Sequence, residues 1–197
     1  SLRISRSTAA SCMPEGGRAH AGFDFSAAAG PIADEVIAGV REGLYDWRAS
    51  GTPVLSLPFN GNAFRDAIDE AGASLRKLLA IPDHYRILFM HGGATAQFAA
   101  LPLNLLRGRS RACYLDSGYW SGKAIAEARR YCTVDVAGSS VATGYDRLPV
   151  APTPHAGAAY CHIVTNETAG GLQYHAFPDT GDLPLAADMT SDFLTRP

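Results

Sequence analysis

Two stretches in the N-terminal third of the chain carry apolar residues at the spacing of an amphipathic helix. The first begins at Asp34, which can cap a helix, and is ended by Gly51. Its apolar positions are Val36, Ile37, Val40, Leu44 and Trp47. The second follows Asn62 and runs to a turn at 81–83, with apolar positions Phe64, Ala67, Ile68, Ala71, Leu75, Leu78 and Leu79. The pattern predicts two helices, separated by a short extended segment at 52–58.

From residue 85 onward, short apolar runs alternate with helical patterns. The runs at 85–90, 111–118, 132–137, 158–165 and 184–190 are predicted to be strands. A helix is predicted within 91–106, after a glycine turn and with Pro102 bending or interrupting it, and another at 121–131, capped by Ser121. Strands that are apolar on both faces and separated by helices indicate an α/β domain with a mainly parallel sheet.

Ligands of such sheets bind beyond the carboxyl ends of the strands, so the residues that follow each predicted strand are the first candidates for a site. These residues are His91, Gly92, Gly93, Ala94 and Thr95, then Tyr119 and Trp120, then Asn166, Glu167 and Thr168, and finally Asp188. We expect them to gather on one rim of the sheet.

The segment “HGGAT” at 91–95 places free backbone N–H groups and a hydroxyl at the start of a helix, which suits an anion such as phosphate. Glycine-rich turns between a strand and a helix are also common for steric reasons alone. The segment matches neither the Walker A loop nor the GxGxxG fingerprint.

Three other rim residues have one structural and one functional interpretation each. Trp120 is either a half-buried core residue or a ring that stacks on a flat aromatic ligand. Thr168 either belongs to an Asx-type turn or donates a hydrogen bond to a ligand. Asp188 ends an apolar strand, where a carboxylate needs a cationic partner, and a ligand cation is a candidate. A phosphate anchor, a planar stacker, a hydroxyl donor and a buried carboxylate together describe a pocket for pyridoxal 5'-phosphate.

Composition narrows the class of protein further. A net charge of -2 provides no attraction to nucleic acid or to an anionic membrane, and no apolar run reaches the length of a membrane span. The four cysteines have no CxxC spacing and suggest buried free thiols of a cytoplasmic protein. Cys161 and His162 alternate faces of a strand, which argues against a shared metal site. Residues 1–22 are rich in Arg, Ser, Ala and Gly and are expected to form a disordered leader before a domain at 23–197.

Six blocks of the sequence resemble, in the same order, the N-terminal half of the phosphoserine aminotransferase family. The blocks are “FDFSAAAGPIADEV”, “LYDWRASGTPVLSL”, “LLAIPDHYRILFMHGGATAQFAALPLNLL”, “SGYWSGKAIAEARRY”, “TNETAGG” and “AADMTSDFLTRP”. The resemblance implies the three-layer α/β large domain of the type I pyridoxal-phosphate transferases. It also implies transfer of an amino group between glutamate and 3-phosphohydroxypyruvate, in serine synthesis and in many bacteria in vitamin B6 synthesis, by a homodimer.

The family's cofactor residues can be carried over position by position. The resemblance assigns Ala94 and Thr95 to the phosphate of the cofactor, Trp120 to the face of its ring, Thr168 to the ring hydroxyl and Asp188 to the pyridine nitrogen. These are residues of the rim that the strand pattern predicts, so the two lines of reasoning agree on one cofactor site.

The sequence departs from the family in three places. The family's Schiff-base lysine lies beyond the final “RP”, where this sequence and its share of the domain stop, so no catalytic lysine and no C-terminal small domain are expected in these residues. At the family's substrate-binding arginine, this sequence has Asn60, which cannot form a bidentate contact with a carboxylate. The family's Ser-Gly-Pro turn aligns with Ala27, Ala28 and Ala29.

Three hypotheses follow. The first is a truncated phosphoserine aminotransferase, predicted to be inactive as this chain alone because the lysine that moves the proton is absent. The second is a non-catalytic relative that binds pyridoxal phosphate without a covalent bond, or serves as an assembly module. The third is an aminotransferase of different substrate specificity, which Asn60 would allow.

Overall fold

The computed structural model describes residues 32–150 and 157–195. The expected leader at 1–22 and the alanine turn at 27–29 lie outside the described residues. Within the described residues, no helix combines the length and hydropathy that crossing a bilayer requires.

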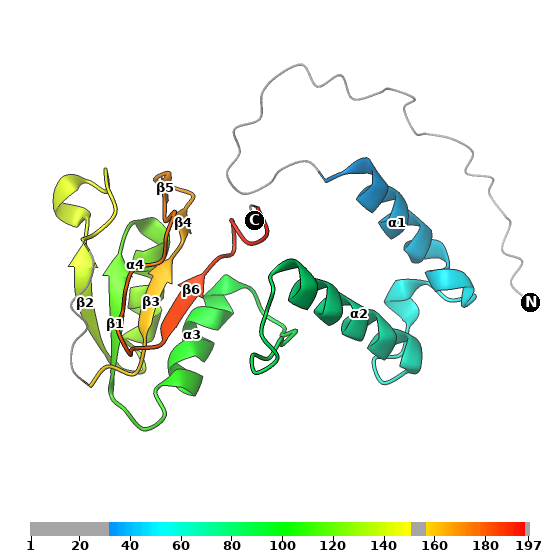
Figure 1. Ribbon diagram of the computed structural model, residues 1–197, viewed down its shortest axis with the longest axis horizontal. Helices are drawn as coiled ribbons and strands as arrows, with labels where there is room; N and C mark the ends of the chain where they lie inside the picture. The colour runs from blue at the N-terminus through cyan, green and yellow to red at the C-terminus, as the bar shows by residue number, and fades with distance from the viewer. Residues whose placement is uncertain (1–31, 151–156, 196–197) are drawn as a thin grey trace, which may run out of the picture.

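Four strands form one sheet with every neighbouring pair parallel. These strands are β1 (Arg111–Asp116), β2 (Thr133–Ser139), β3 (Cys161–Val164) and β6 (Leu185–Asp188). Their order across the sheet is β2-β1-β3-β6, so β1 and β3 are central and β6 forms one edge (Figure 1). The predicted α/β domain with a mainly parallel sheet is confirmed, and four of the five predicted strands are present.

Helices α3 (Ala94–Leu105) and α4 (Tyr119–Ala128) pack against one face of the sheet. Phe98 of α3 and Ile125 of α4 meet Tyr114 and Tyr160 in this core, and the two tyrosine hydroxyls share a hydrogen bond of 2.8 Å. Burial of these rings is the main stabilisation of this face. α3 continues through Pro102, so the predicted bend does not end the helix.

The opposite face is covered by connecting segments. Its buried side chains are Cys113, Leu115, Ala158, Cys161, Ile163 and Tyr174, with Leu148 and Leu183 packed against them. Cys113 and Cys161 are partners in the β1–β3 register, and both are buried free thiols. Cys161 and His162 face opposite sides of the sheet, as the strand pattern predicts. Among the described residues, no cluster of His, Cys, Asp and Glu could hold a metal ion.

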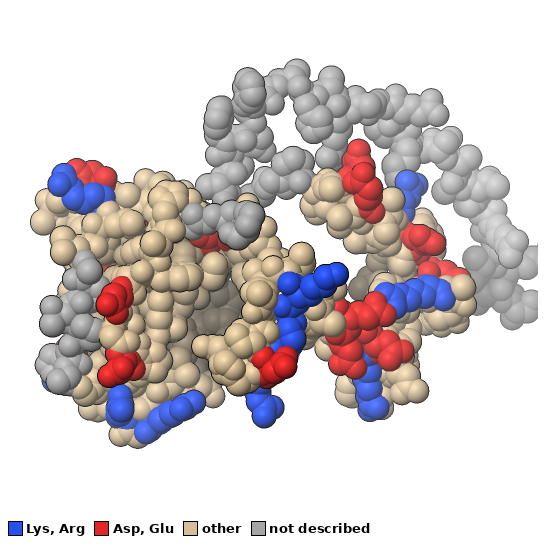
Figure 2. Space-filling view, viewed as in Figure 1, with Lys and Arg blue, Asp and Glu red and all other residues tan. Residues whose placement is uncertain are grey.

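Two helices precede the sheet and lie to one side of it. α1 (Asp34–Tyr45) and α2 (Asn62–Leu78) agree with the predicted helices, and Figure 1 shows that neither covers the sheet. Arg48, in the short helix η1 (Trp47–Ala49), joins them through a bidentate ion pair with Glu70. The apolar positions Val36, Ile37, Val40 and Leu44 of α1 are exposed. On the face in Figure 2, charged side chains gather over this helical part, and the sheet part is mostly uncharged.

The predicted strand at 85–90 is wrong for this structure. The segment has no regular secondary structure, and Leu88, Phe89 and Met90 are 71, 50 and 58% exposed. An apolar run becomes a strand only when a neighbouring strand accepts its hydrogen bonds, and no described segment pairs with this one.

Two shorter predictions also change, and two small elements were not predicted. The segment 52–58 contains the 3-10 turn η2 (Val54–Ser56) instead of extended chain. α4 begins at Tyr119, so Ser121 lies inside the first turn and accepts from the N–H of Ser117 and Gly118. The sequence also missed a small hairpin, β4 (Asn166–Glu167) and β5 (Leu172–Gln173), and the turn η3 (Val141–Thr143).

His162 is a titratable group in the core between α3 and the sheet. It is 0% exposed, contacts the rings of Phe98 and Tyr114, and neither ring nitrogen has a hydrogen-bond partner. Burial lowers its pKa to about 4, and the negative charge of Asp188 offsets part of this effect. His162 is therefore neutral in the folded protein at pH 7.

This burial predicts a loss of stability in acid. The folded pKa is below the ordinary value of 6.5, so the unfolded chain takes up the proton first as the pH falls. We expect the free energy of unfolding to fall by about 3 kcal/mol between pH 7 and pH 4 because of this residue. Denaturant titrations over this range measure it. In His162→Leu the free energy of unfolding should no longer fall with pH in this way, whereas in the exposed control His84→Gln it should fall as in the parent. An equal dependence on pH in both variants would contradict the assignment.

Candidate cofactor site

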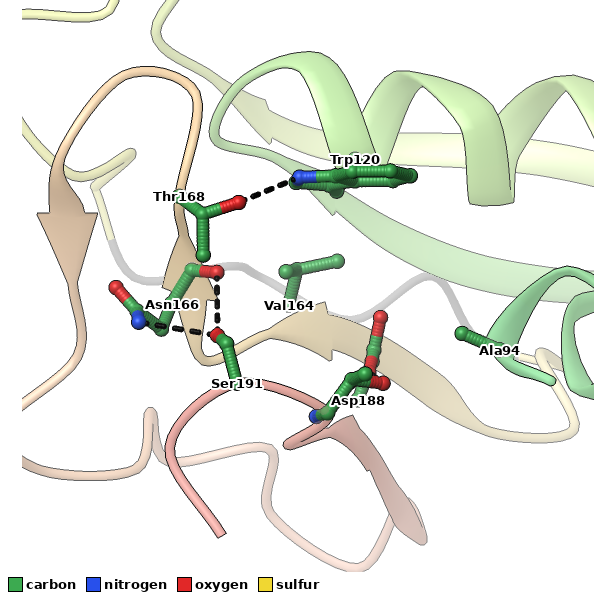
Figure 3. A pocket seen from close by; sticks show the side chains of 8 residues that line it. Ala94, Trp120, Val164, Asn166, Thr168, Asp188 and Ser191 are labelled. Atoms are coloured by element: carbon green, nitrogen blue, oxygen red, sulfur yellow. Dashed lines mark hydrogen bonds between the residues drawn. The ribbon is translucent and has the colours of Figure 1, made fainter. Parts of the chain in front are cut away.

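A pocket lies where the carboxyl ends of β3 and β6 meet the first turns of α3 and α4. It has a volume of about 140 Å³ and is lined by Ala94, Trp120, Val164, Asn166, Thr168, Asp188, Thr190 and Ser191 (Figure 3). A second cavity of about 310 Å³ shares Ala94, Asp188 and Thr190 with it and extends to Gly92, Gly93 and His162. The strand pattern predicts a site at this rim, and the structure has a pocket at that place.

Trp120 and Thr168 form one wall of the pocket. The indole N–H of Trp120 donates to Oγ1 of Thr168 at 2.9 Å, and Figure 3 shows the indole across the pocket from Asp188 and Ala94. Trp120 is 37% exposed, so its ring has a face available to a ligand. Thr168 accepts from Trp120 and keeps its own hydroxyl proton for a second partner.

Asp188 ends β6 and is the partner of Val164 in the β3–β6 register. The sequence suggested a buried carboxylate, but the side chain is only half-buried because the pocket opens beside it. Its Oδ1 accepts from the N–H and the hydroxyl of Thr190. In the part of the chain that the structure describes, no Lys or Arg forms an ion pair with Asp188. A cationic ligand would therefore meet a carboxylate whose charge is not neutralised by the protein.

The turn at Gly92 and Gly93 leads into α3. Gly93 has no side chain to cap the helix, and its carbonyl accepts from the N–H of Ala96 and Gln97. Backbone N–H groups at the start of a helix, together with the helix dipole, bind anions. Ala94 lines both cavities from this position, whereas Thr95 is exposed and lines neither.

The structure therefore brings together four of the five predicted cofactor residues: Ala94, Trp120, Thr168 and Asp188. Asn60, the predicted substrate-side residue, is exposed in the turn before α2 and does not line this pocket.

Sequence reasoning missed two residues that line the pocket. Thr190 and Ser191 line the pocket from the turn after β6, and Asn166 donates to the hydroxyl of Ser191 at 3.0 Å. The signal that could have found them is their position at the end of the last predicted strand, 184–190, and directly after it. Glu167 was predicted on the rim without a role, and in the structure its carboxylate accepts from N–H groups of α4 and does not line the pocket.

A larger cavity, of about 800 Å³, lies at the amino ends of the strands. Its lining includes Arg109, Tyr160 and Thr180. It is a weaker candidate because it lies on the edge of the sheet opposite to the one where ligands of parallel α/β proteins bind.

Comparison with known proteins assigns the class. Residues 23–164 match the model of the family described as aminotransferase class-V, and the chain belongs to that family.

Within this class, the similar proteins share one name. The chain is 42% identical over 184 residues to the phosphoserine aminotransferase of Nitrosomonas europaea, which covers 89% of the chain and 50% of that protein. It is 44% identical over 177 residues to the phosphoserine aminotransferase of Pseudomonas aeruginosa, and this match covers 89% of the chain and 49% of that protein. The chain spans about half the length of these curated relatives.

Solved structures agree with the sequence comparison. Phosphoserine aminotransferase from Bacillus circulans subsp. alkalophilus matches with a TM-score of 0.83 at 38% identity, over 88% of this chain and 48% of that one. A PLP-bound phosphoserine aminotransferase from Trichomonas vaginalis matches with a TM-score of 0.81 at 33% identity, over 88% and 52%. The architecture of the sheet and its helices is therefore that of the corresponding part of these enzymes.

The glycine turn before α3 gives a matched pair of variants. Gly92 has φ +89, and an added Cβ would lie 2.8 Å from Cβ of Ala96. Gly93 has φ -89, and an added Cβ would meet nothing within 4 Å. We expect Gly92→Ala to lower the free energy of unfolding by about 1–3 kcal/mol and Gly93→Ala to change it by less than about 0.5 kcal/mol. Chemical denaturation measures both, and equal losses would contradict the assigned geometry.

Proposed function

We propose that this chain is the cofactor-binding part of a phosphoserine aminotransferase that uses pyridoxal 5'-phosphate. The observation that carries the proposal is the single pocket that joins Ala94, Trp120, Thr168 and Asp188 at the carboxyl ends of the strands. Membership of the class-V family and the shared name of the relatives support it. In this proposal, residues 23–197 form part of the cofactor-binding large domain, and the reaction converts glutamate and 3-phosphohydroxypyruvate into 2-oxoglutarate and phosphoserine.

The residues present fit the chemical groups of this cofactor. The uncapped start of α3 at Ala94 and Thr95 suits a phosphate, and the exposed face of Trp120 suits an aromatic ring. Thr168 has a hydroxyl proton for the ring oxygen, because its oxygen already accepts from Trp120. Asp188 has no cationic partner among the described residues and suits a protonated pyridine nitrogen.

These residues bind and orient the cofactor. When bound, pyridoxal phosphate supplies a ring that withdraws electrons from the amino acid substrate. The role of Asp188 is to keep the proton on the ring nitrogen, since a carboxylate beside it favours the charged form. Trp120 and Thr168 would hold the ring of the cofactor from one side of the pocket, and the open side of the pocket would remain accessible to the amino and keto acid substrates.

Several finer points belong to the same proposal. Serine synthesis, and in bacteria vitamin B6 synthesis, would use this reaction in the cytoplasm. The exposed apolar positions of α1, Val36, Ile37, Val40 and Leu44, support assembly into a homodimer. Asn60 in place of the family arginine supports an alternative, an aminotransferase of different substrate, because an amide binds a carboxylate more weakly than a guanidinium.

A second candidate function is that of a non-catalytic relative, which binds the cofactor without a covalent bond or acts as an assembly module. The two lysines of the sequence support it, since neither lines the pocket: Lys77 is in α2, and Lys123 lies over the ring of Tyr119 at 5.2 Å.

Cofactor binding can be measured through Trp120. In a Trp47→Phe background the indole of Trp120 is the remaining tryptophan, and pyridoxal phosphate should quench its fluorescence. Asp188→Asn should weaken binding about 10-fold, because a neutral amide replaces a charge-assisted contact. The control Asp182→Asn, at the other end of the strands, should bind as the parent does. An unchanged affinity for Asp188→Asn would remove the proposed role of Asp188.

Covalent attachment separates the two candidates. After addition of pyridoxal phosphate and reduction with borohydride, we expect no stoichiometric adduct on this chain, because Lys77 and Lys123 lie outside the pocket. Intact mass spectrometry and peptide mapping measure this. An adduct at either lysine that supports turnover with glutamate would contradict the prediction and give that lysine the catalytic role.

A further inference from the structure

The ring of Trp120 depends on its backbone for its position. Besides the bond from the indole N–H to Thr168, the ring contacts Tyr119 edge-on, with 5.0 Å between ring centroids. The position of the indole also depends on the main chain that carries it, and Trp120 is 37% exposed. That main chain is the first turn of α4, whose N–H groups have no acceptors within the helix.

Glu167 supplies these acceptors. Its Oε2 accepts from the N–H of Trp120 at 2.8 Å, and its Oε1 accepts from the N–H of Ser121 at 2.8 Å and from the hydroxyl of Ser117 at 3.3 Å. The start of α4 is therefore capped by a side chain from β4, far along the sequence. Thr168, the next residue, holds the indole end of the same tryptophan.

The carboxylate of Glu167 is well suited to this position. It is 1% exposed, and no Lys or Arg of the described chain forms an ion pair with it. The helix N-terminus and the two N–H donors compensate for its burial. Hydrogen bonds to an ionised acceptor are about twice as strong as neutral ones, so this cap resists displacement.

The surrounding backbone leaves room for Glu167 and fixes it. An added Cβ at Gly118 would lie 2.8 Å from Cδ of Glu167, so only glycine admits the carboxylate here. The carbonyl of Glu167 accepts from the N–H of Gly170 and Gly171, and the residue pairs with Leu172 in the β4–β5 hairpin. The backbone of Glu167 is therefore fixed by the β4–β5 hairpin, and its carboxylate is fixed by the N–H groups of α4.

We propose that Glu167 is the positioning residue of Trp120. Its carboxylate fixes the first turn of α4, so that the indole lies across the pocket within reach of Thr168. Glu167 does not line the pocket, so it acts on a ligand only through Trp120. The consequence for pyridoxal phosphate rests on the proposed function, but the position of the indole does not.

The test compares Trp120 in the presence and absence of Glu167. In the Trp47→Phe chain without cofactor, Glu167→Gln should shift the emission of Trp120 and increase its quenching by acrylamide, because an amide offers one acceptor where the carboxylate offers two. The affinity for pyridoxal phosphate should fall about 10-fold with it. Gly118→Ala forces the carboxylate of Glu167 away from the first turn of α4 and should change the emission of Trp120 in the same direction. This variant replaces Glu167→Gln in the test if Glu167→Gln does not fold.

Two controls separate positioning from general loss of stability. Glu127→Gln makes the same chemical change near the other end of α4, and Tyr160→Phe removes a buried hydrogen bond from the core. Both should leave the emission and quenching of Trp120 unchanged, even where the melting temperature falls. Parent-like emission and quenching in Glu167→Gln would overturn the proposal. If the emission changes but the parent chain does not bind pyridoxal phosphate, the positioning role stands and the proposed function fails.

Discussion

The parallel pairing of β1, β3 and β6 is the constraint on which the rest of the structure depends. Tyr114 is paired with His162, and Val164 with Asp188, so segments far apart in the sequence end at the same edge. The residues that follow parallel strands all lie at the same edge of the sheet. In an antiparallel sheet, the residues that follow neighbouring strands would lie at opposite edges. Tyr119 and the carboxylate of Asp188 lie at this rim because of this direction, and Ala94 joins the pocket from the start of α3, which no described strand precedes.

Two helices begin at that rim, and their first turns are different electrostatically. The start of α4 is occupied, since Glu167 and Ser121 accept from its N–H groups. The start of α3 has no side-chain cap. Both helix termini carry partial positive charge, but only the uncapped one is available to an external anion. In the proposed function, this difference would direct the phosphate of the cofactor to the α3 side of the pocket and leave the α4 side, next to Trp120, for its ring.

The parts of the fold that local pattern controls could be predicted from the sequence. Helix α2 and strands β1 and β6 follow from periodicity and flanking turns, and Trp120, Thr168 and Asp188 follow from their place at the ends of strands. Ala94 lines the pocket although the strand predicted before it is absent from the described residues. Features that depend on a distant partner could not. The run at 85–90 is as apolar as a strand but has no described neighbour, and the role of Glu167 depends on backbone N–H groups of a helix that precedes it by many residues. Periodicity contains no information on either pairing.

The outer edge of β6 has a consequence for handling the chain in solution. Within the described residues β6 has β3 on one side only, so its remaining N–H and C=O groups face outward next to Ala186 and Ala187. An open edge of this kind can pair with strands of other molecules. The exposed side chains of Leu88, Phe89 and Met90 add an apolar surface that favours association. At high concentration the chain in isolation is therefore prone to self-association by edge pairing, and charged substitutions along β6 are the means to keep it dispersed.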